Sequence, residues 1–207
     1  MKFTLPFIRN KPQSDDSLQI KINHAEPQAK QKIINSLHQY LNPVSSMRDI
    51  VIVCIGTDRS TGDALGPLVG TYLHKVNNPH YHIYGTLDQP VHALNLNDTL
   101  NDIHRHHYNP YIIAIDACLG QVTSIGYIQV GEGPVKPGAG VNKNLPEVGD
   151  MHITGIVNVG GFMEYFVLQN TRLNLVMNLS ETIAVSIVDT FSLLKIPSST
   201  IPIAKFD

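Results

Sequence analysis

The sequence is poor in the features that mark membrane-spanning, secreted and nucleic-acid-binding proteins. No run approaches the ~20 apolar residues of a membrane-spanning helix, and residues 1–9 lack the apolar centre of a signal peptide. The only 2 cysteines, Cys54 and Cys118, lie in runs typical of buried strands, which favours small core residues in a reducing cytosol over a redox pair. The formal net charge of -2 gives no electrostatic attraction to nucleic acid or to an anionic membrane. We therefore expect a soluble cytoplasmic protein that binds neither nucleic acid nor membranes.

The short motifs of several common enzyme classes are also missing. Five residues separate Gly56 from Gly62 and no lysine follows, so this segment is neither a phosphate-binding P-loop nor a G-x-G-x-x-G turn. The chain contains no G-x-S-x-G elbow and no H-E-x-x-H helix. His104, His106 and His107 resemble a metal-binding tract, but their place at the end of a polar helix favours a solvated face. A nucleotide-handling hydrolase is therefore the weakest of the enzyme hypotheses.

One polar stretch stands out, residues 56–67, with the sequence GTDRSTGDALGP. It follows the apolar, largely β-branched run Ile50–Ile55, which predicts a strand buried on both faces. Apolar residues at helical spacing continue to Val76. The stretch is thus a strand-to-helix turn at the carboxyl end of a strand, where open α/β sheets bind their ligands. Its candidate substrate-binding residues are Asp58, Arg59, Ser60 and Thr61.

Strand-like and helix-like segments alternate along the chain, which predicts a three-layer α/β/α sandwich with a mostly parallel central sheet, of the phosphorylase/hydrolase-like kind. Residues 1–25 show little periodicity and are expected to form a weakly ordered arm before one domain at 26–207. Dense glycine and proline in 131–150 predict a long flap over a cleft, with Gly138 and Gly140 as substrate-binding candidates. The expected strands are 50–56, 81–87, 111–118, 124–130 and 172–179, and the expected helices are 26–41, 65–77, 91–107, 160–169 and a last one capped by Ser180.

Two acids are placed to meet at the same edge of this sheet. Asp63 opens the first helix after the polar turn, and Asp116 closes the expected strand 111–118. If that strand neighbours 50–56, the two carboxyl ends lie ~5 Å apart. Two such carboxylates either share a proton or hold a cation. His152, after the glycine-rich loop, could reach the same cleft, and with Asp63 and Asp116 it would form a donor set suited to Zn, Ni or Mn.

Each of these residues also has a simpler explanation. Asp63 could serve only as a helix cap, and Asp116 could cap a turn through Gly120. His152 taken alone is typical of a hydrogen-bonded loop residue. The functional hypothesis depends on the three residues occurring together at one edge of one sheet.

The polar stretch and four further segments resemble the YyaC-type sporulation proteins, a family described as candidate spore proteases. The four segments are DACLG at 116–120, PGAGV at 137–141, HITGIVN at 152–158 and QNTRL at 169–173. The resemblance covers roughly residues 50–195 and leaves out the segment before residue 45. That family in turn resembles the germination proteases, which degrade small spore proteins, and the hydrogenase-maturation endopeptidases.

The resemblance implies functions for the same residues. In the germination proteases the acids that match Asp63 and Asp116 are implicated in peptide cleavage. In the hydrogenase-maturation enzymes acids at these two places and a histidine, matched by His152, bind nickel of the substrate. The resemblance therefore implies an endopeptidase acting in sporulation or germination, in the forespore or mother cell, on a protein or peptide substrate that includes small spore proteins as candidates. The alternative is a catalytically silent protein that binds a peptide or a metal on the same fold.

Overall fold

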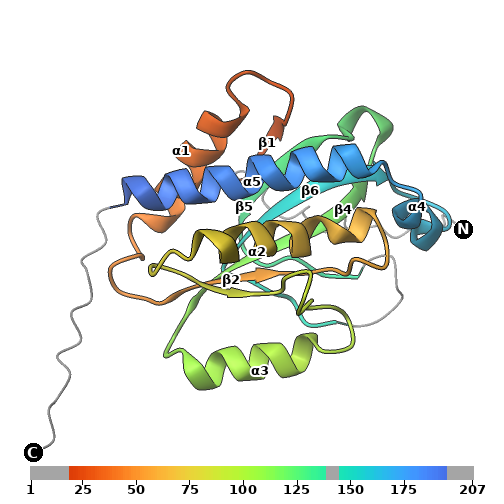
Figure 1. Cartoon of the computed structure of the whole chain (residues 1–207). Coiled ribbons are helices and arrows are strands. Elements are labelled where there is room, and N and C mark those ends of the chain that lie inside the picture. Colours follow the sequence, from red (N-terminus) through yellow and green to blue (C-terminus); the bar gives the residue numbers. More distant parts are fainter. Residues whose placement is uncertain (1–18, 139–144, 195–207) are drawn as a thin grey trace, which may run out of the picture.

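Six strands form one mixed sheet in the order β1-β5-β6-β4-β2-β3 (Figure 1). The computed structural model describes residues 19–138 and 145–194. Strands β3, β2, β4 and β6 are parallel; β5 pairs antiparallel with β6, and β1 pairs antiparallel with β5. The strands are β1 (Ile20–Asn23), β2 (Ile50–Cys54), β3 (His82–Tyr84), β4 (Tyr111–Gly120), β5 (Tyr127–Glu132) and β6 (Met151–Val159). The predicted α/β sandwich with a mostly parallel sheet is confirmed.

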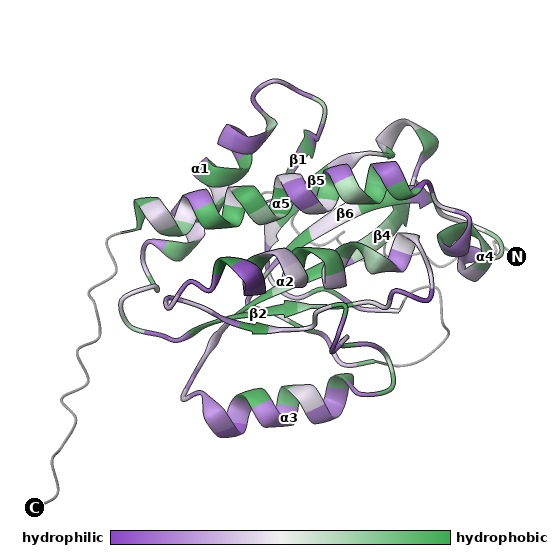
Figure 2. Ribbon diagram, viewed as in Figure 1, coloured by the Kyte–Doolittle hydropathy of each residue, from purple (hydrophilic) through white to green (hydrophobic). Residues whose placement is uncertain are grey.

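Helices cover both faces of the sheet. Helices α1, α2 and α5 lie on one face and α3 lies on the other, while α4 sits at one end of the molecule (Figure 1). The helices are α1 (Ala29–Leu41), α2 (Leu65–Val76), α3 (Leu96–His106), α4 (Glu164–Gln169) and α5 (Leu173–Leu193). Figure 2 shows hydrophilic residues on the side of α3 that faces away from the sheet. Among the described residues, no helix is both long enough and apolar enough to cross a membrane.

Alternate residues of the buried strands belong to two separate cores. In β2, Ile50 and Ile52 pack in the core beneath α1, α2 and α5. Val51 and Val53 point the other way, into a smaller core beneath α3 that includes Ile103. All five residues of β2 are buried, because a central parallel strand has helices on both faces. The continuous apolar run in the sequence therefore predicted this strand correctly.

Three expectations for secondary structure were wrong. The expected arm 1–25 contains strand β1 at Ile20–Asn23, which pairs with β5, while residues 1–18 lie outside the described part of the chain. The expected strand 172–179 is instead the start of α5, because Val176, Leu179 and Ile183 are buried at helical spacing. Ser180 is not a cap: it lies inside α5, and its hydroxyl donates to the carbonyl oxygen of Met177 (2.9 Å).

Other boundaries shifted by a few residues. The expected helix 91–107 begins only at Leu96, since Val91 forms a parallel bridge with Ile55 and extends the sheet. The strand expected at 81–87 is confined to His82–Tyr84, and the helix expected at 160–169 to Glu164–Gln169. In the expected loop 131–150, β5 reaches Glu132 and Val135 pairs with Val148; residues 139–144 are outside the described part.

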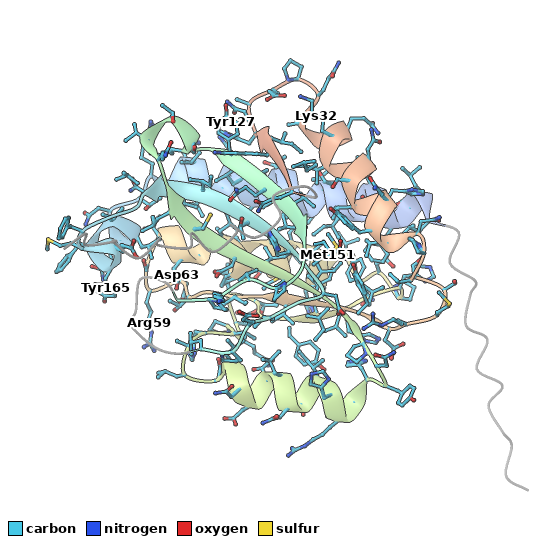
Figure 3. The ribbon with its side chains drawn as sticks, turned by 180° about the vertical axis from the view of Figure 1, so that it is seen from behind. Lys32, Arg59, Asp63, Tyr127, Met151 and Tyr165 are labelled. Atoms are coloured by element: carbon cyan, nitrogen blue, oxygen red, sulfur yellow. The ribbon has the colours of Figure 1, made fainter. Side chains whose placement is uncertain are left out.

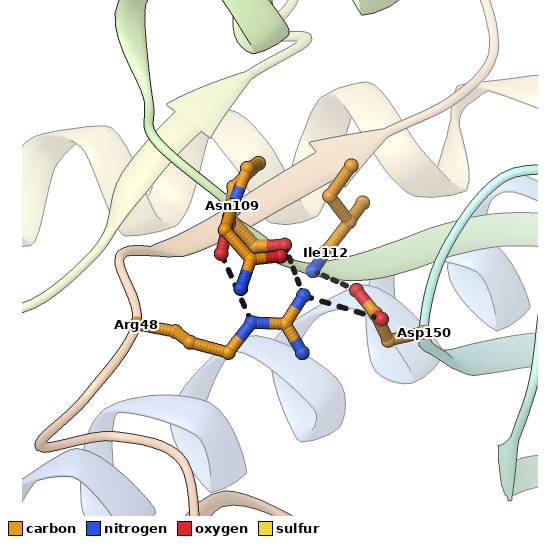
Figure 4. Close-up of polar contacts among 5 residues, drawn as sticks. Arg48, Asn109, Ile112 and Asp150 are labelled. Atoms are coloured by element: carbon orange, nitrogen blue, oxygen red, sulfur yellow. Dashed lines mark hydrogen bonds and ion pairs between the residues drawn. The ribbon is translucent and has the colours of Figure 1, made fainter.

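The amino end of the parallel strands is held by a polar cluster around Arg48 (Figure 4). The Arg48 guanidinium donates to the carbonyl oxygens of Asn109 (2.9 Å) and Pro110 (2.5 Å), and its Nη2 lies 3.4 Å from Oδ1 of Asp150. The other carboxylate oxygen of Asp150 accepts the backbone N–H of Ile112 (2.7 Å). One charged pair thus ties the start of β4 to the segment that enters β6.

Candidate active site

Asp63 is positioned by a tight turn between β2 and α2. The chain reverses at Gly56, which has φ of 138°, and the backbone N–H of Thr57 donates to the carbonyl oxygen of Asp63 (3.1 Å). A Cβ on Gly56 would lie 2.0 Å from that oxygen, and a Cβ on Gly66 would lie 2.1 Å from the carbonyl oxygen of Ile55. Both positions therefore require glycine, because backbone packs directly on backbone there. This is the structural reason for the spacing of glycines in the polar stretch.

Asp116 lies at the same edge, where the neighbouring strand stops. Strand β2 is adjacent to β4, as expected, and its last residue, Cys54, pairs with the residue just before Asp116. Asp116 does not close its strand, however: β4 continues to Gly120, paired with β6, and Asp116 lies opposite Thr154. The Gly62–Ala64 turn that contains Asp63 packs against β4. The two acids, far apart in sequence, thus line the same clefts.

Burial and mutual repulsion govern the protonation of the two carboxyl groups. Desolvation raises the pKa of Asp63 from 3.8 to about 6, although the N–H of Thr57 and the charge of His92 lower it in part. The pKa of Asp116 lies well above its usual value, first because the group is buried and second because Asp63 is nearby. The backbone N–H of Ala117 donates to Asp116 Oδ1 (2.9 Å) and offsets little of this rise. Asp116 is the more deeply buried of the two acids, so burial favours a single proton shared by the pair and held on Asp116.

Two clefts meet at this acid pair. The first, which we call the His152 cleft, has a volume of about 370 Å³ and is mixed in character. The second, the Tyr165 cleft, has a volume of about 270 Å³ and is mainly apolar. Both clefts include Asp63, Asp116, Gly138 and Leu168. The His152 cleft is also lined by Gln19, Ala117, Cys118, Leu119, Gln129, Val135, Lys136, His152, Thr154 and Glu164. The Tyr165 cleft is also lined by Ile55, Gly56, Thr57, Arg59, Ser60, His92, Ala93, Leu94, Pro137, Leu145 and Tyr165.

A larger hollow of about 990 Å³ lies away from the acids, between α2, β3 and α3. It shares His92 with the Tyr165 cleft, but neither Asp63 nor Asp116 lines it. Its size alone does not make it the reaction site, since neither of the two buried acids with raised pKa values lines it. The acid pair therefore identifies the candidate active site.

His152 does not join the acids as a third metal ligand. It lies on β6, two residues before Thr154 and thus roughly 7 Å along the strand from the level of Asp116. Its Nδ1 donates to the carbonyl oxygen of Gly133 (2.9 Å), so in the neutral ring Nε2 accepts from the side-chain amide of Gln19 (3.1 Å). Within residues 19–138 and 145–194, no three His, Cys, Asp or Glu side chains are grouped to hold one metal ion.

The metal site expected from Asp63, Asp116 and His152 is accordingly not assembled in this structure, because both ring nitrogens of His152 have other partners. The donors for Zn, Ni or Mn are present in the sequence but do not converge. His152 nevertheless lines one of the two clefts at the acids, as the sequence predicted.

The other predicted residues divide into three groups. Arg59 and Ser60 line the Tyr165 cleft, and Gly138 lines both clefts. Asp58 and Thr61 belong to the same turn but line neither cleft. Gly140 lies outside the described residues. Figure 3 shows Arg59, Asp63 and Tyr165 gathered at one end of the molecule, away from Lys32 and Tyr127.

Sequence analysis missed several residues of the site, above all His92. The bridge between Val91 and Ile55 carries His92 to the carboxyl edge of the sheet, where its charge lowers the pKa of Asp63. Thr154 and Gln129 were also missed; they line the His152 cleft, and the Thr154 hydroxyl donates to Oε1 of Gln129 (3.3 Å). The only sequence signal for His92 was its position directly after Pro90 and Val91, at the end of a turn.

Two polar atoms in the Tyr165 cleft lack hydrogen-bond partners. Ser60 Oγ and His92 Nδ1 are buried and unpaired in the described part of the chain, together with Tyr81 Oη elsewhere. An unsatisfied buried polar group costs about 1–3 kcal/mol, so native structures contain few of them. Two of the three therefore fall beside the acid pair.

Comparison with known proteins agrees with the fold and the resemblance. The chain is 57% identical over 171 residues to "Uncharacterized protein YyaC" of Bacillus subtilis (strain 168), covering 83% of each protein. Its structure is similar to that of the [NiFe] hydrogenase maturation protease HycI from Thermococcus kodakarensis KOD1, with a TM-score of 0.50 and 19% identity over 74% of this chain and 99% of the other. The YyaC-type resemblance and the protease-like fold are thus confirmed. A family profile described as "Protein of unknown function (DUF1256)" matches residues 21–186, and the chain belongs to that family.

Proposed function

We propose that this protein is a peptidase that hydrolyses a peptide bond in a protein substrate during sporulation or spore germination. The observation that carries the proposal is the buried acid pair, Asp63 and Asp116, at the junction of two clefts. Its placement on a fold similar to that of a hydrogenase maturation protease supports a peptidase. In this proposal the protein acts in the cytoplasm of the forespore or of the mother cell.

The two acids have different roles because their environments separate their pKa values. Asp63, with a pKa of about 6, is ionised at neutral pH and takes a proton from a water molecule as that water attacks the scissile carbonyl carbon. In this mechanism Asp116, whose pKa is raised well above its usual value by burial and by Asp63, starts protonated and gives its proton to the departing amide nitrogen as the C–N bond breaks. The pair then holds one proton again, now on Asp63, and proton exchange between the acids restores the starting state.

The surrounding clefts exclude water and hold the substrate on both sides of the acids. Asp116 is 8% exposed, so burial disfavours its charged form. It therefore keeps its proton until the amide nitrogen of a bound substrate can accept it. Gly138 lines both clefts and contributes no side chain, which leaves room for an extended backbone to pass beside the acids. Residues on either side of the scissile bond then occupy different clefts.

Incubation of the full-length protein with extracts of small spore proteins between pH 4 and pH 8, with and without a chelator, tests the proposal. We expect cleavage that does not depend on the chelator and that is lost in Asp63→Asn and Asp116→Asn. Absence of proteolysis at every pH, together with tight capture of a peptide, would contradict a peptidase and favour the silent binding protein. Chelator-sensitive cleavage would contradict the metal-free roles of the two acids.

A further inference from the structure

The Tyr165 cleft has the composition of a pocket for one apolar side chain. Its walls carry the side chains of Ile55, Ala93, Leu94, Leu145, Tyr165 and Leu168. Leu94 is 77% exposed and Tyr165 is 53% exposed, so the rim of the cleft presents apolar surface that a ligand can cover. A volume of about 270 Å³ falls just below the range of drug-sized ligand sites, so the space suits a single residue of a larger molecule.

Two polar groups in the same cleft are available to a backbone. Ser60 is 8% exposed, and its hydroxyl has no partner among the described residues; Nδ1 of His92 is in the same condition. An apolar pocket with a few hydrogen-bonding groups is the usual form of a specific binding site. A peptide backbone entering with its side chain offers an N–H and a C=O, the kinds of partner that these two atoms lack.

The surface next to the cleft favours a macromolecular ligand. Helix α4 has no buried residue, and it packs against the turn that contains Asp63. Phe162 is 97% exposed, Met163 66% and Phe166 53%, so these side chains continue the apolar surface beyond Tyr165. Contiguous exposed apolar residues are typical of protein-interaction surfaces. A free amino acid or small metabolite would leave most of this surface uncovered.

We infer that the Tyr165 cleft is a specificity subsite that takes one large apolar side chain of an extended polypeptide, next to the scissile bond, while Ser60 and His92 bind the adjoining backbone. The inference rests on the proposed peptidase function and names its substrate class: a polypeptide with a Phe-, Leu- or Met-sized residue beside the cleavage site. The His152 cleft, with Gln129, Lys136 and Thr154, receives the more polar residues on the other side.

A set of acetylated and amidated heptapeptides that are identical except for the central residue (Phe, Leu, Ala, Lys or Glu) tests the inference. Binding is measured by calorimetry to the full-length Asp116→Asn variant, which keeps the clefts but lacks the proton donor. We expect the Phe and Leu peptides to bind at least about 10-fold more tightly than the Ala, Lys and Glu peptides, as burial of a large apolar side chain predicts. Equal affinity across the set would overturn the inference.

Three further variants, each added to Asp116→Asn, separate side-chain from backbone recognition. Ala93→Trp fills the Tyr165 cleft and should abolish the preference, whereas Ala25→Trp, at an exposed site in the turn before α1, should keep it. Ser60→Ala should weaken binding of all five peptides by about 2- to 10-fold without changing their order, because the backbone is common to them. A preference that survives Ala93→Trp contradicts the assignment of the cleft.

Cleavage of the same peptides by the wild-type protein distinguishes failure of the inference from failure of the proposed function. Cleavage with no relation to the central residue would refute the subsite and leave the peptidase in place. Apolar-selective binding without any cleavage would support the subsite and refute the peptidase. Cleavage next to Phe or Leu supports both.

Discussion

The two ends of the parallel strands are built in opposite ways. At the amino end, Arg48 and Asp150 form an ion pair and use their remaining polar atoms on backbone groups of Asn109, Pro110 and Ile112. At the carboxyl end, two acids are buried together, and two further residues keep polar atoms that have no partner in the part of the chain that the structure describes. The ion pair and its hydrogen bonds stabilise the amino end, whereas the carboxyl end keeps acids and polar atoms in environments that cost free energy. Such a contrast is expected where one end of a sheet serves folding and the other serves chemistry.

The largest expected effect is on catalysis at the carboxyl end. Asp63→Asn and Asp116→Asn each remove a proton-transfer group with little change in shape, so cleavage should fall by at least about 10²–10⁴-fold. Thermal stability should hold or rise, since a desolvated acid is replaced by a neutral amide. Cleavage rates with a peptide that the wild type cuts, and thermal melts of the same samples, check this. Unfolding of either variant would instead support a structural role for that acid.

The next effect concerns stability and pH. The pKa of Asp63 is raised from 3.8 to about 6 in the folded protein, so the unfolded chain loses this proton first as pH rises. The contribution of Asp63 to the free energy of unfolding is therefore fully present below about pH 4. It falls by roughly 3 kcal/mol as the pH rises through about 6. Urea unfolding at pH 4 and pH 7 should show Asp63→Asn gaining that amount relative to the wild type. Asp116 acts in the same direction, and removal of Asp63 also lowers its pKa. If the unfolding free energies of the wild type and of Asp63→Asn changed with pH in the same way, a raised pKa at Asp63 would be contradicted.

At the amino end the expected effect falls on stability alone. Asp150→Ala leaves the N–H of Ile112 and the guanidinium of Arg48 without their partner, so unfolding free energy should fall by about 1–3 kcal/mol while cleavage is retained. Asp189→Ala is a control, because its ion pair with Lys30 is exposed and worth less than about 1 kcal/mol. Urea midpoints of the three proteins test the difference. Equal midpoints, or loss of cleavage in Asp150→Ala, would remove the contrast between the ends.

The smallest expected effect links His92 to the acids. Its charge lowers the pKa of Asp63, so His92→Ala should move the acidic limb of the kcat/KM profile to higher pH by less than about one unit. His104→Ala, on the exposed end of α3, should leave the profile in place. A shift to lower pH, or an equal shift in both variants, would show that His92 does not tune Asp63.

Much of the fold could be predicted because several segments have one dominant signal. The run Ile50–Ile55 is apolar throughout, and the spacing after Leu65 fits only a helix, so the acid-bearing turn was placed correctly. In α5 the same reasoning failed: a polar Ser180 at a buried position hid a helical period that continues through Ile183. Strand β1 could not be predicted, because only Ile22 of its four residues is buried and its pairing with β5 depends on a distant segment.

The candidate site was predictable where residues follow strands directly. Asp63 and Asp116 could be placed because neighbouring parallel strands bring their carboxyl ends together. His92 could not, since a single bridge to Ile55 rather than a strand holds it there. The partners of His152 could not be predicted either, because a backbone carbonyl of Gly133 and the amide of Gln19 leave no trace in its local sequence.

The glycine contacts beneath Asp63 also bear on how such a protein can diverge. Gly56 and Gly66 leave no space for a methyl group between turn, strand and helix, so the turn that holds Asp63 tolerates no larger residue at these two positions. The rim formed by Ala93, Leu94 and α4 carries no such restriction. Related proteins could therefore come to cleave different polypeptides through substitutions at the rim, while the turn that holds Asp63 stays the same.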